Sequence, residues 1–471
     1  MSGEEYALQV NEQLKAVELK LHKIGKDKKH GAHMRAFWAS TISFFMAFVG
    51  WFALAPVAIE VCHSIDACEN QLYPPVGTPT RKAFLKFKDI KTGNLYCQYG
   101  KSGDDAKSPT GCEPVPDDVL TSADCASCPT ADGLSEKSDD CPEKCQRYRY
   151  ELLPKCMCSP GTHCGDTILY SSIGSVAVTI FVRVALGTLL ERFGPVNVQS
   201  GLLTFGALWV LASTGISAEW NFILIRTMIG CAGATFVTNQ FWCSLMFAPN
   251  VVGTANATAA GWGNLGGGVT QIFIVWCLFK PLQAMGLDSN AAWRMSMVVP
   301  GCLFLVIAIV MKLNCWDTPT KPRFNVSDTG KTTKASLWDY VECLKDPRID
   351  IMILQYGACF GTELVMNAQL ATHFRVYFQM NAGSASALAG SFGMMNLFAR
   401  SLGGIFSDFL FSKFGFPGRI WAQFVCLFLE GIFLFAFGSV DDSNEWYVAL
   451  MVLLCFSLFV QMTEGTSYGI V

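Results

Sequence analysis

The sequence contains ten long apolar stretches that are separated by short polar segments. A helix needs about 20 apolar residues to cross the hydrocarbon core of a bilayer, and backbone polar groups in lipid must find partners within their own element. Hydrophobic residues make up 51% of the chain and charged residues 15%, whereas soluble proteins carry about 25% charged residues. The sequence therefore predicts an all-α polytopic membrane protein. The expected spans are 36–61, 167–190, 198–217, 220–246, 251–279, 292–313, 349–378, 384–411, 419–438 and 445–471.

Two segments rich in Lys and Arg predict how the chain crosses the membrane. One is the polar N-terminal tail, 1–35, which carries no cleavable signal, and the other is the linker 314–348 between the sixth and seventh spans. Short segments with an excess of Lys and Arg stay in the cytoplasm. The even number of spans between these two segments agrees with a cytoplasmic place for both. The net charge of −3 gives no sign of a nucleic-acid partner.

A weak internal repeat indicates two related halves. Arg183 is followed by a glycine four residues later, an acidic residue and a basic-Phe-Gly turn, and Arg400 is followed by the same order of residue types. The repeat assigns 36–313 to a six-helix half and 349–471 to a second half of about four helices, a layout typical of transporters. Two full halves need twelve spans, and the sequence is still apolar at Val471. We therefore expect a C-terminally truncated chain with about ten of twelve spans; the alternative is a natural ten-helix protein.

The loop 62–165 between the first two spans is rich in cysteine. The predicted topology places this loop outside the cell, where disulfides persist, and so long a polar segment needs such links to stay compact. A zinc site is the alternative, because two pairs of these cysteines have ligand-like spacing. Disulfides are favoured, since no His pair accompanies the cysteines, and Cys62 at the membrane edge is the candidate for the unpaired one. The eleven cysteines are Cys62, Cys68, Cys97, Cys112, Cys125, Cys128, Cys141, Cys145, Cys156, Cys158 and Cys164.

Arg183 and Arg400 are the first candidates for a functional site, because both lie within predicted spans. A charged side chain in mid-span costs about 2.5–3.5 kcal/mol on insertion scales and therefore faces a cavity or a partner. A guanidinium is always charged, and its planar fork of donors fits a planar oxyanion. Related positions in two halves would direct both arginines at one central anion. The alternative is an ion pair between helices, with Glu363 or Glu464 as the partner.

Two further polar residues lie in the fourth and fifth spans. Arg226, near one end of its span, is expected to reach the membrane interface, with a role in substrate binding as the weaker alternative. Asn264 lies in the glycine-rich run 260–271, where small residues at i, i+4 and i+8 allow another backbone to approach closely. Packing explains most of these glycines. The amide of Asn264 could donate to an anion or form a hydrogen bond between helices.

One face of the seventh span carries functional side-chain types. Tyr356, Phe360, Glu363 and Asn367 are spaced at i, i+4, i+7 and i+11, which places them on one stripe of a helix. Such a stripe suits a pore better than lipid. Glu363 is a candidate proton carrier or the structural partner of an arginine. Glu464 in the last span and Glu430 in the ninth are weaker candidates for proton coupling.

These motifs resemble the nitrate/nitrite porter family of the major facilitator superfamily. The run Ala-Gly-Trp-Gly-Asn-Leu-Gly-Gly-Gly-Val-Thr-Gln at 260–271 is similar to the nitrate signature of that family. The segments 33–37 and 51–56 resemble the first helix of eukaryotic high-affinity members, and 355–364 resembles their seventh helix. The residues 464–471 look like the beginning of a second signature. The loop 62–165 is longer than in most members, and algal or other microbial eukaryotic membership fits the pattern.

The resemblance implies roles for six residues. The two nitrate-coordinating arginines of the family match Arg183 and Arg400, and the signature asparagine that contacts substrate matches Asn264. The remaining three matches are aromatic side chains around the anion, Tyr356 and Phe360 in the seventh span and Phe236 in the fourth. Eukaryotic members are similar in being proton-coupled symporters, whereas many bacterial members exchange nitrate for nitrite.

The expected function is high-affinity nitrate uptake by alternating access across the plasma membrane, with proton symport and nitrate held between two arginines. The alternatives are a transporter or exchanger of nitrite or another small anion, and a nitrate sensor that uses the extracellular loop. We expect no enzymatic activity, cofactor, resident metal or nucleic-acid partner. The expected partners are nitrate or nitrite, protons, the lipid bilayer and, as in some relatives, a single-span accessory protein.

Overall fold

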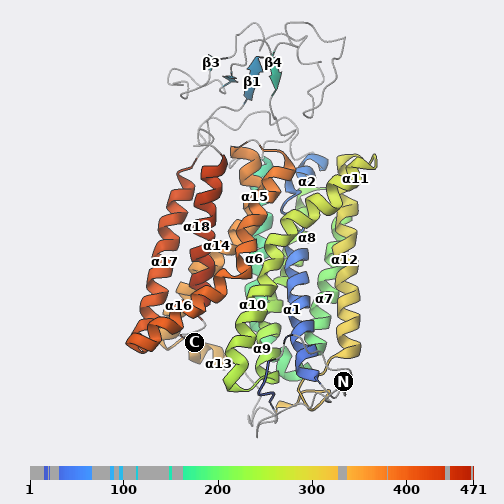
Figure 1. Ribbon diagram of the computed structural model, residues 1–471. Coiled ribbons are helices and arrows are strands. Elements are labelled where there is room, and N and C mark those ends of the chain that lie inside the picture. The colour runs from blue at the N-terminus through green and yellow to red at the C-terminus, as the bar shows by residue number, and fades with distance from the viewer. Residues whose placement is uncertain are drawn as a thin grey trace, which may run out of the picture.

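A computed structural model describes residues 15–19, 21, 31–65, 163–326, 337–378, 380–440, 446–467 and 470, together with four short strands between 85 and 150. The described helices form one elongated bundle whose axes run roughly parallel (Figure 1). We call the end of the bundle at which the first helix, α1 (Ala32–Trp51), begins the inner end, and the opposite end the outer end.

The helices before the linker make up the first group. Several spans are composite, because short 3-10 or π segments continue the α-helices. In chain order the elements are α1 (Ala32–Trp51), α2 (Ala58–Ser64), α6 (His163–Phe193), α7 (Pro195–Ala212), η1 (Ser213–Gly215), α8 (Glu219–Gly230), η2 (Cys231–Ala234), α9 (Thr235–Met246), α10 (Pro249–Ile272), η3 (Phe273–Phe279), α11 (Lys280–Ala284) and α12 (Ser289–Asn314).

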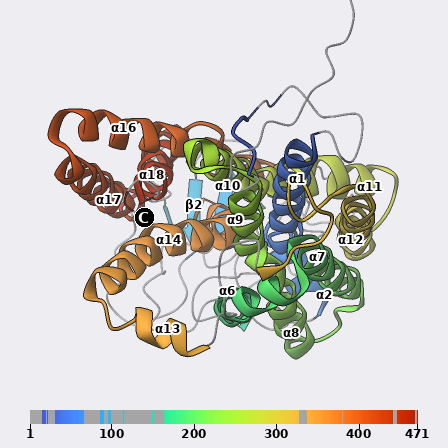
Figure 2. The same cartoon turned by 90° about the horizontal axis from the view of Figure 1, so that it is seen from below.

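The helices after the linker make up the second group. Viewed from the inner end, α14, α16, α17 and α18 lie on the side of the bundle away from α1, α7 and α12 (Figure 2). The elements are α13 (Leu337–Cys343), α14 (Pro347–Tyr377), α15 (Ala382–Met394), η5 (Met395–Leu397), α16 (Ala399–Phe414), α17 (Phe416–Gly438) and α18 (Trp446–Ser467).

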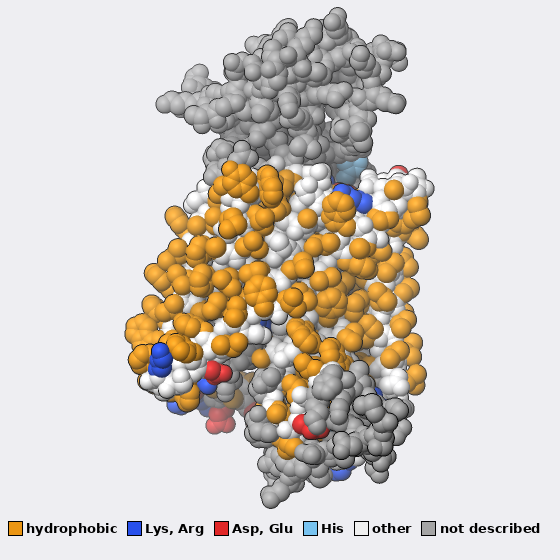
Figure 3. Space-filling view, viewed as in Figure 1, with side chains coloured by type: hydrophobic (Ala, Val, Ile, Leu, Met, Phe, Trp, Pro, Cys, Tyr) orange, Lys and Arg blue, Asp and Glu red, His pale blue; other side chains and the backbone are white. Residues whose placement is uncertain are grey.

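The prediction of a helical membrane protein is confirmed. Eight helical segments of the described chain are long and apolar enough to cross a membrane. Each of the ten predicted spans coincides with helix; the first, α1, and the eighth, α15 to α16, fall outside that set of eight. Apolar side chains cover the middle of the flank in Figure 3, while most charged side chains gather toward the two ends, as a bilayer requires.

The first predicted span is shorter than expected. The helix α1 ends at Trp51, and α2 begins at Ala58 after a series of turns that contains Pro56. A proline has no backbone N–H to donate and its ring clashes with the preceding turn, so a helix seldom continues through it. The predicted span 36–61 is therefore two helices joined by a turn.

The segment between α2 and α6 contains a small sheet that the sequence did not predict. Its strands are β1 (Leu85–Asp89), β2 (Leu95–Gln98), β3 (Glu113–Pro114) and β4 (Tyr148–Tyr150), in the order β3-β2-β1-β4. The strand β1 pairs antiparallel with β2 and β4, whereas β2 pairs parallel with β3. The sheet lies beyond the outer end of the bundle (Figure 1).

Two cysteines at the ends of this segment have described side chains. Cys62 is a free, buried thiol, which agrees with its prediction as the unpaired cysteine. Cys164 is disulfide-bonded, which agrees with the disulfide interpretation at this position. The cysteines between 68 and 158, including the two pairs with zinc-like spacing, lie outside the side chains that the structure describes.

Glycines bring the two groups of helices into close contact. A Cβ added to Gly268 of α10 would lie 2.5 Å from the carbonyl carbon of Gly393 in α15. This is closer than real Cβ contacts, so α10 and α15 touch backbone to backbone at this crossing. The packing explanation for this glycine is therefore correct.

Similar glycine contacts recur within each group, which agrees with the internal repeat. Gly230 of α8 lies against the carbonyl oxygen of Ser175 in α6, and Gly465 of α18 lies against the carbonyl oxygen of Arg400 in α16. In both groups, the helix that carries a predicted site arginine thus packs through a glycine against the second helix after it.

Candidate anion-binding site

Arg400 lies at the start of α16, where η5 has just ended, and is only 2% exposed. Its Nη2 is 3.1 Å from Oε2 of Glu363 on α14 and also contacts Oε2 of Glu464 on α18. The same nitrogen donates to Oε1 of Gln461 at 3.3 Å. Both carboxylates are fully buried, so this guanidinium forms the ion pair between helices that stood as the alternative to an anion site.

Asn264 connects this cluster to the first group of helices. It is fully buried on α10, and with its amide oxygen turned toward Arg400 it accepts from Nη1 at 2.7 Å and from Nη2 at 2.5 Å. The amide is thus a neutral acceptor for the guanidinium in this state, rather than a donor to an anion. Arg400 therefore joins α10, α14, α16 and α18.

Two neighbours orient the Glu363 carboxylate. Asn396 of η5 donates to Oε1 at 2.7 Å, and Gln461 of α18 donates to the same oxygen at 3.2 Å. Both amides were missed in the sequence. The signal that could have found them is spacing, because Asn396 precedes Arg400 by four residues and Gln461 precedes Glu464 by three, which puts each pair on one helix face.

Arg183 lies against aromatic side chains. It is half-buried on α6, and its Nη2 donates to the carbonyl oxygen of Gly233 at 3.3 Å. Its guanidinium carbon lies 5.1 Å from the ring centre of Phe360 and 5.7 Å from that of Phe236. These distances allow cation–π attraction and place two apolar rings beside the charge.

The helix α14 links the two arginine environments. Phe360, next to Arg183, and Glu363, paired with Arg400, are three residues apart and so lie on neighbouring positions of one helix face. Tyr356 stacks on Phe360 with ring centres 5.4 Å apart. All predicted site residues therefore lie in two adjoining clusters, one around each arginine.

Arg226 does not reach the membrane interface, so that prediction is wrong. It is 2% exposed, donates to the Ser171 hydroxyl at 3.0 Å, and lies 3.5 Å from the carbonyl oxygen of Ala368 in α14. These buried oxygen atoms accept hydrogen bonds from the Arg226 guanidinium, so the side chain remains in the interior of the bundle. It contributes to the contact between the two groups of helices.

A second ion pair joins the two groups near the outer end. Nη1 of Arg375 on α14 lies 2.6 and 2.7 Å from the two carboxylate oxygens of Glu60 on α2. The side chains are 12% and 11% exposed. Nearby, Gln369 of α14 donates to the Ser172 hydroxyl of α6 at 2.9 Å. The sequence did not reveal this pair, because its members are 315 residues apart.

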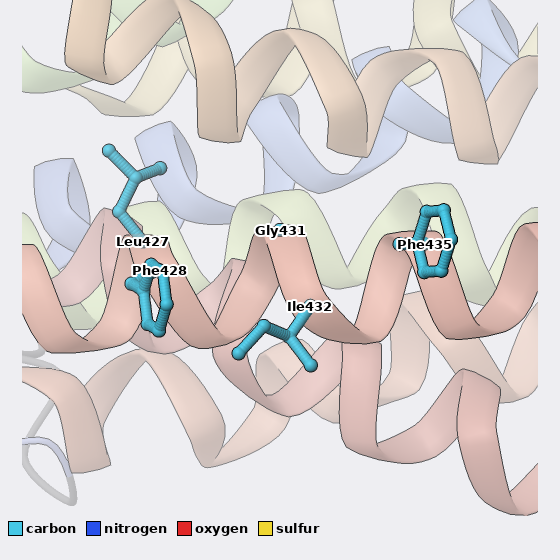
Figure 4. Close-up of a pocket in the computed structure, with 5 residues that line it drawn as sticks. All are labelled: Leu427, Phe428, Gly431, Ile432 and Phe435. Carbon is cyan, nitrogen blue, oxygen red and sulfur yellow. The ribbon is translucent and has the colours of Figure 1, made fainter.

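One hollow on the bundle surface does not suit an anion. It lies along α17 and is lined by Leu427, Phe428, Gly431, Ile432 and Phe435 (Figure 4). Its side chains are apolar and stand on an exposed flank, so they offer no hydrogen-bond donor. Arg183 and Arg400 therefore remain the candidate anion-binding groups.

Comparison with known proteins identifies the family. The model of the Major Facilitator Superfamily matches residues 166–471. The chain belongs to the Major Facilitator Superfamily. Among solved structures, a bacterial homolog of the human lysosomal transporter Spinster, in an inward-facing and unoccupied conformation, has a TM-score of 0.55 at 10% identity. The match covers 93% of this chain and 75% of that one and supports the fold alone.

Curated relatives give closer sequence matches. The high affinity nitrate transporter 2.5 of Arabidopsis thaliana is 36% identical over 302 residues, which are 64% of this chain and 59% of that protein. The nitrate transporter 2.1 of Chlamydomonas reinhardtii is 35% identical over 309 residues, 65% of this chain and 55% of that protein. The nitrate/nitrite transporter NrtP of a Picosynechococcus strain is 23% identical over 383 residues, 63% of this chain and 70% of that protein.

These matches agree with the resemblance to nitrate/nitrite porters seen in the sequence motifs. The relatives are transporters and not enzymes, as expected for this chain. The match spans less than two thirds of the length of the two eukaryotic relatives.

Proposed function

We propose that this protein takes up nitrate by alternating access, with the anion held between Arg183 and Arg400 and with protons as the coupling ions. The observation that carries the proposal is the pair of arginines, one from each group of helices, in adjoining clusters that share α14. Relatives named as nitrate transporters support the substrate.

The ion pairs of Arg400 suggest how binding and coupling are connected. In this state Glu363 and Glu464 neutralise the guanidinium and occupy donors that an anion would need. Protonation of a carboxylate removes its charge and weakens its hold on Arg400. Nitrate could then take its place on the planar donor fork, so that the anion binds best after protons have bound.

The environment of Arg183 would complete the site. Phe236 and Phe360 exclude water from one side of this guanidinium, and their ring faces attract the cation. A planar anion between the two arginines would offset the mutual repulsion of their charges. Binding would therefore let the two groups of helices approach each other, which is the differential interaction that alternating access requires.

Coupling to protons is needed for an energetic reason. Moving one anion into a cell whose potential is negative costs about 2.3 kcal/mol per 100 mV. If both Glu363 and Glu464 carried a proton with each nitrate, the net movement would be one positive charge inward, and the potential would favour uptake. We place the N-terminal tail and the linker in the cytosol, and the protein in the plasma membrane.

Nitrate-evoked currents recorded with the full-length protein at several external pH values test this proposal. We expect inward currents that grow as the external pH falls, since protons are taken up with the anion. Currents that do not change with pH would contradict proton symport. Flux of nitrate into vesicles would separate transport from a sensor.

Nitrite is the second candidate substrate, because the NrtP relatives are named nitrate/nitrite transporters. Nitrite is also a planar oxyanion with two oxygens for a guanidinium fork. Competition between the two anions for uptake measures the preference.

A further inference from the structure

The interface between α17 and α18 contains buried polar side chains that the anion site does not use. Glu430 lies near the middle of α17 and is 3% exposed. Thr463 of α18 lies beside this side chain, and its own hydroxyl donates to the carbonyl oxygen of Phe459 at 2.7 Å. One carboxylate oxygen, Oε2, accepts no hydrogen bond from any group in the described part of the chain.

The charges around Glu430 do not balance if every carboxyl is ionised. Glu430, Glu363 and Glu464 are each at most 3% exposed and lie within electrostatic range of one another. The titratable groups that interact with Glu430 are Glu363 and Cys359 on α14, Glu464 on α18 and Cys426 on its own helix, and Arg400 on α16 contacts two of these, Glu363 and Glu464.

Three carboxylates would therefore share one guanidinium. An unpaired charge buried in a low-dielectric interior is costly, and such a group takes up a proton instead. Glu363 and Glu464 contact Arg400 directly, whereas Glu430 does not have this contact. Glu430 thus lacks the direct counter-charge that the other two carboxyls share, and it takes up a proton in this state.

Polar side chains continue from Glu430 toward the inner end. Gln423 lies two helical turns earlier on α17, about 10 Å along the axis at 1.5 Å per residue, and is 1% exposed. Its Oε1 accepts from the Thr466 hydroxyl and, at 3.3 Å, from the Ser467 hydroxyl at the end of α18. The rest of this interface is largely apolar, so these groups form a polar line between the carboxyl cluster and the inner end.

We propose that Glu430 is a proton-binding residue that receives a proton from Glu464 and passes it toward the inner end between α17 and α18, apart from the path of the anion. The proton leaves the carboxylic acid of Glu464, whose carboxylate then pairs with Arg400, and adds to the carboxylate of Glu430. The proton moves from one carboxyl group to another, so nothing is oxidised or reduced. The structure corresponds to the state after this transfer, and the inference rests on the proton coupling proposed above.

Two readouts on the same proteoliposomes, made with the full-length protein, test the proposal. Nitrate counterflow exchanges the anion without net proton movement, while a trapped pH dye reports protons that enter with nitrate. We expect Glu430→Gln to keep counterflow close to the wild-type rate and to lower protons per nitrate by about 100-fold, the low end for loss of a positioned proton-transfer group. Cys426→Ala, one turn away and also buried, is the matched control and should leave both readouts unchanged.

The possible outcomes are separable. If wild-type protein takes up no protons with nitrate, proton coupling itself is wrong; if Glu430→Gln keeps the wild-type ratio of protons to nitrate, only the role of Glu430 is wrong. Equal loss of both readouts would indicate a packing role and overturn the proposal. Should Glu430→Gln not fold, Glu430→Asp is measured instead. A shifted pH profile of uptake in that variant supports the proposal, and an unchanged profile overturns it.

Discussion

Replacing Glu60 by Gln should open the outer end of the bundle. In this structure Glu60 and Arg375 form a doubly bonded ion pair that ties α2 to α14. Alternating access requires the outer end to separate, so the pair must break in the outward-open state. Its loss therefore destabilises only the state seen here and shifts the equilibrium toward the open one.

The size of the shift follows from the geometry. Hydrogen bonds to charged groups contribute about 1.5–3 kcal/mol net, and this pair is largely shielded from solvent at 11–12% exposure. Taking ~2 kcal/mol, with 1.4 kcal/mol for each factor of ten, the ratio of open to closed molecules should rise about 30-fold. Arg375→Gln should produce a similar shift, and the double variant should shift no further than either single one.

Distances between spin labels on unnatural amino acids at Ser217 and Ser439 would report this ratio. Both positions are exposed at the outer end, one in each group of helices, and this labelling avoids the native cysteines. Glu219→Gln is the matched control, because Glu219 pairs with His163 of its own group. Unchanged distance distributions in Glu60→Gln, or additive shifts in the double variant, would refute the reasoning.

Three further predictions concern packing, the linker and the anion site. Gly268→Ala should lower the melting temperature in detergent, because the added Cβ meets the backbone at Gly393 and overpacking costs about 1–3 kcal/mol. Gly261→Ala is the control, since no atom lies closer than 3.4 Å to its added Cβ, and this variant should melt like wild type. Asp317→Ala should speed protease cleavage of the linker, because it removes the acceptor of two backbone N–H groups at 2.9 Å and an unsatisfied donor costs about 1–3 kcal/mol; equal cleavage rates would contradict this. Glu363→Gln should tighten equilibrium nitrate binding at neutral pH by about tenfold, since it frees part of the Arg400 charge at the value of one charge-assisted hydrogen bond; weaker binding would show that nitrate does not compete with this carboxylate.

The membrane fold could be predicted because each membrane-spanning helix is apolar along its own length, independently of the other helices. A span must satisfy its backbone internally and face lipid with apolar side chains, so each helix leaves a signal in its own residues. Local deviations depend on finer features. The break at Pro56 could have been read from the proline, and Pro281, two residues after the π segment η3, is a similar mark in the fifth span.

The sequence predicted which residues form the candidate site better than it predicted which of them contact each other. The arginines, Asn264 and the acidic residues could be found because charged and amide groups are rare in spans. Which carboxylate meets which arginine depends on how α14, α16 and α18 lie side by side, and a single sequence does not record that. The ion pair at Glu60 was missed for the same reason, since its partner lies on a distant helix.

The most direct test of the account is equilibrium binding of labelled nitrate to wild-type protein and to Arg183→Lys and Arg400→Lys. Each substitution keeps the charge but loses the planar donor fork. Both variants are expected to bind nitrate at least about tenfold more weakly, the value of one charge-assisted hydrogen bond. Wild-type affinity in both variants would contradict an anion held between the two arginines.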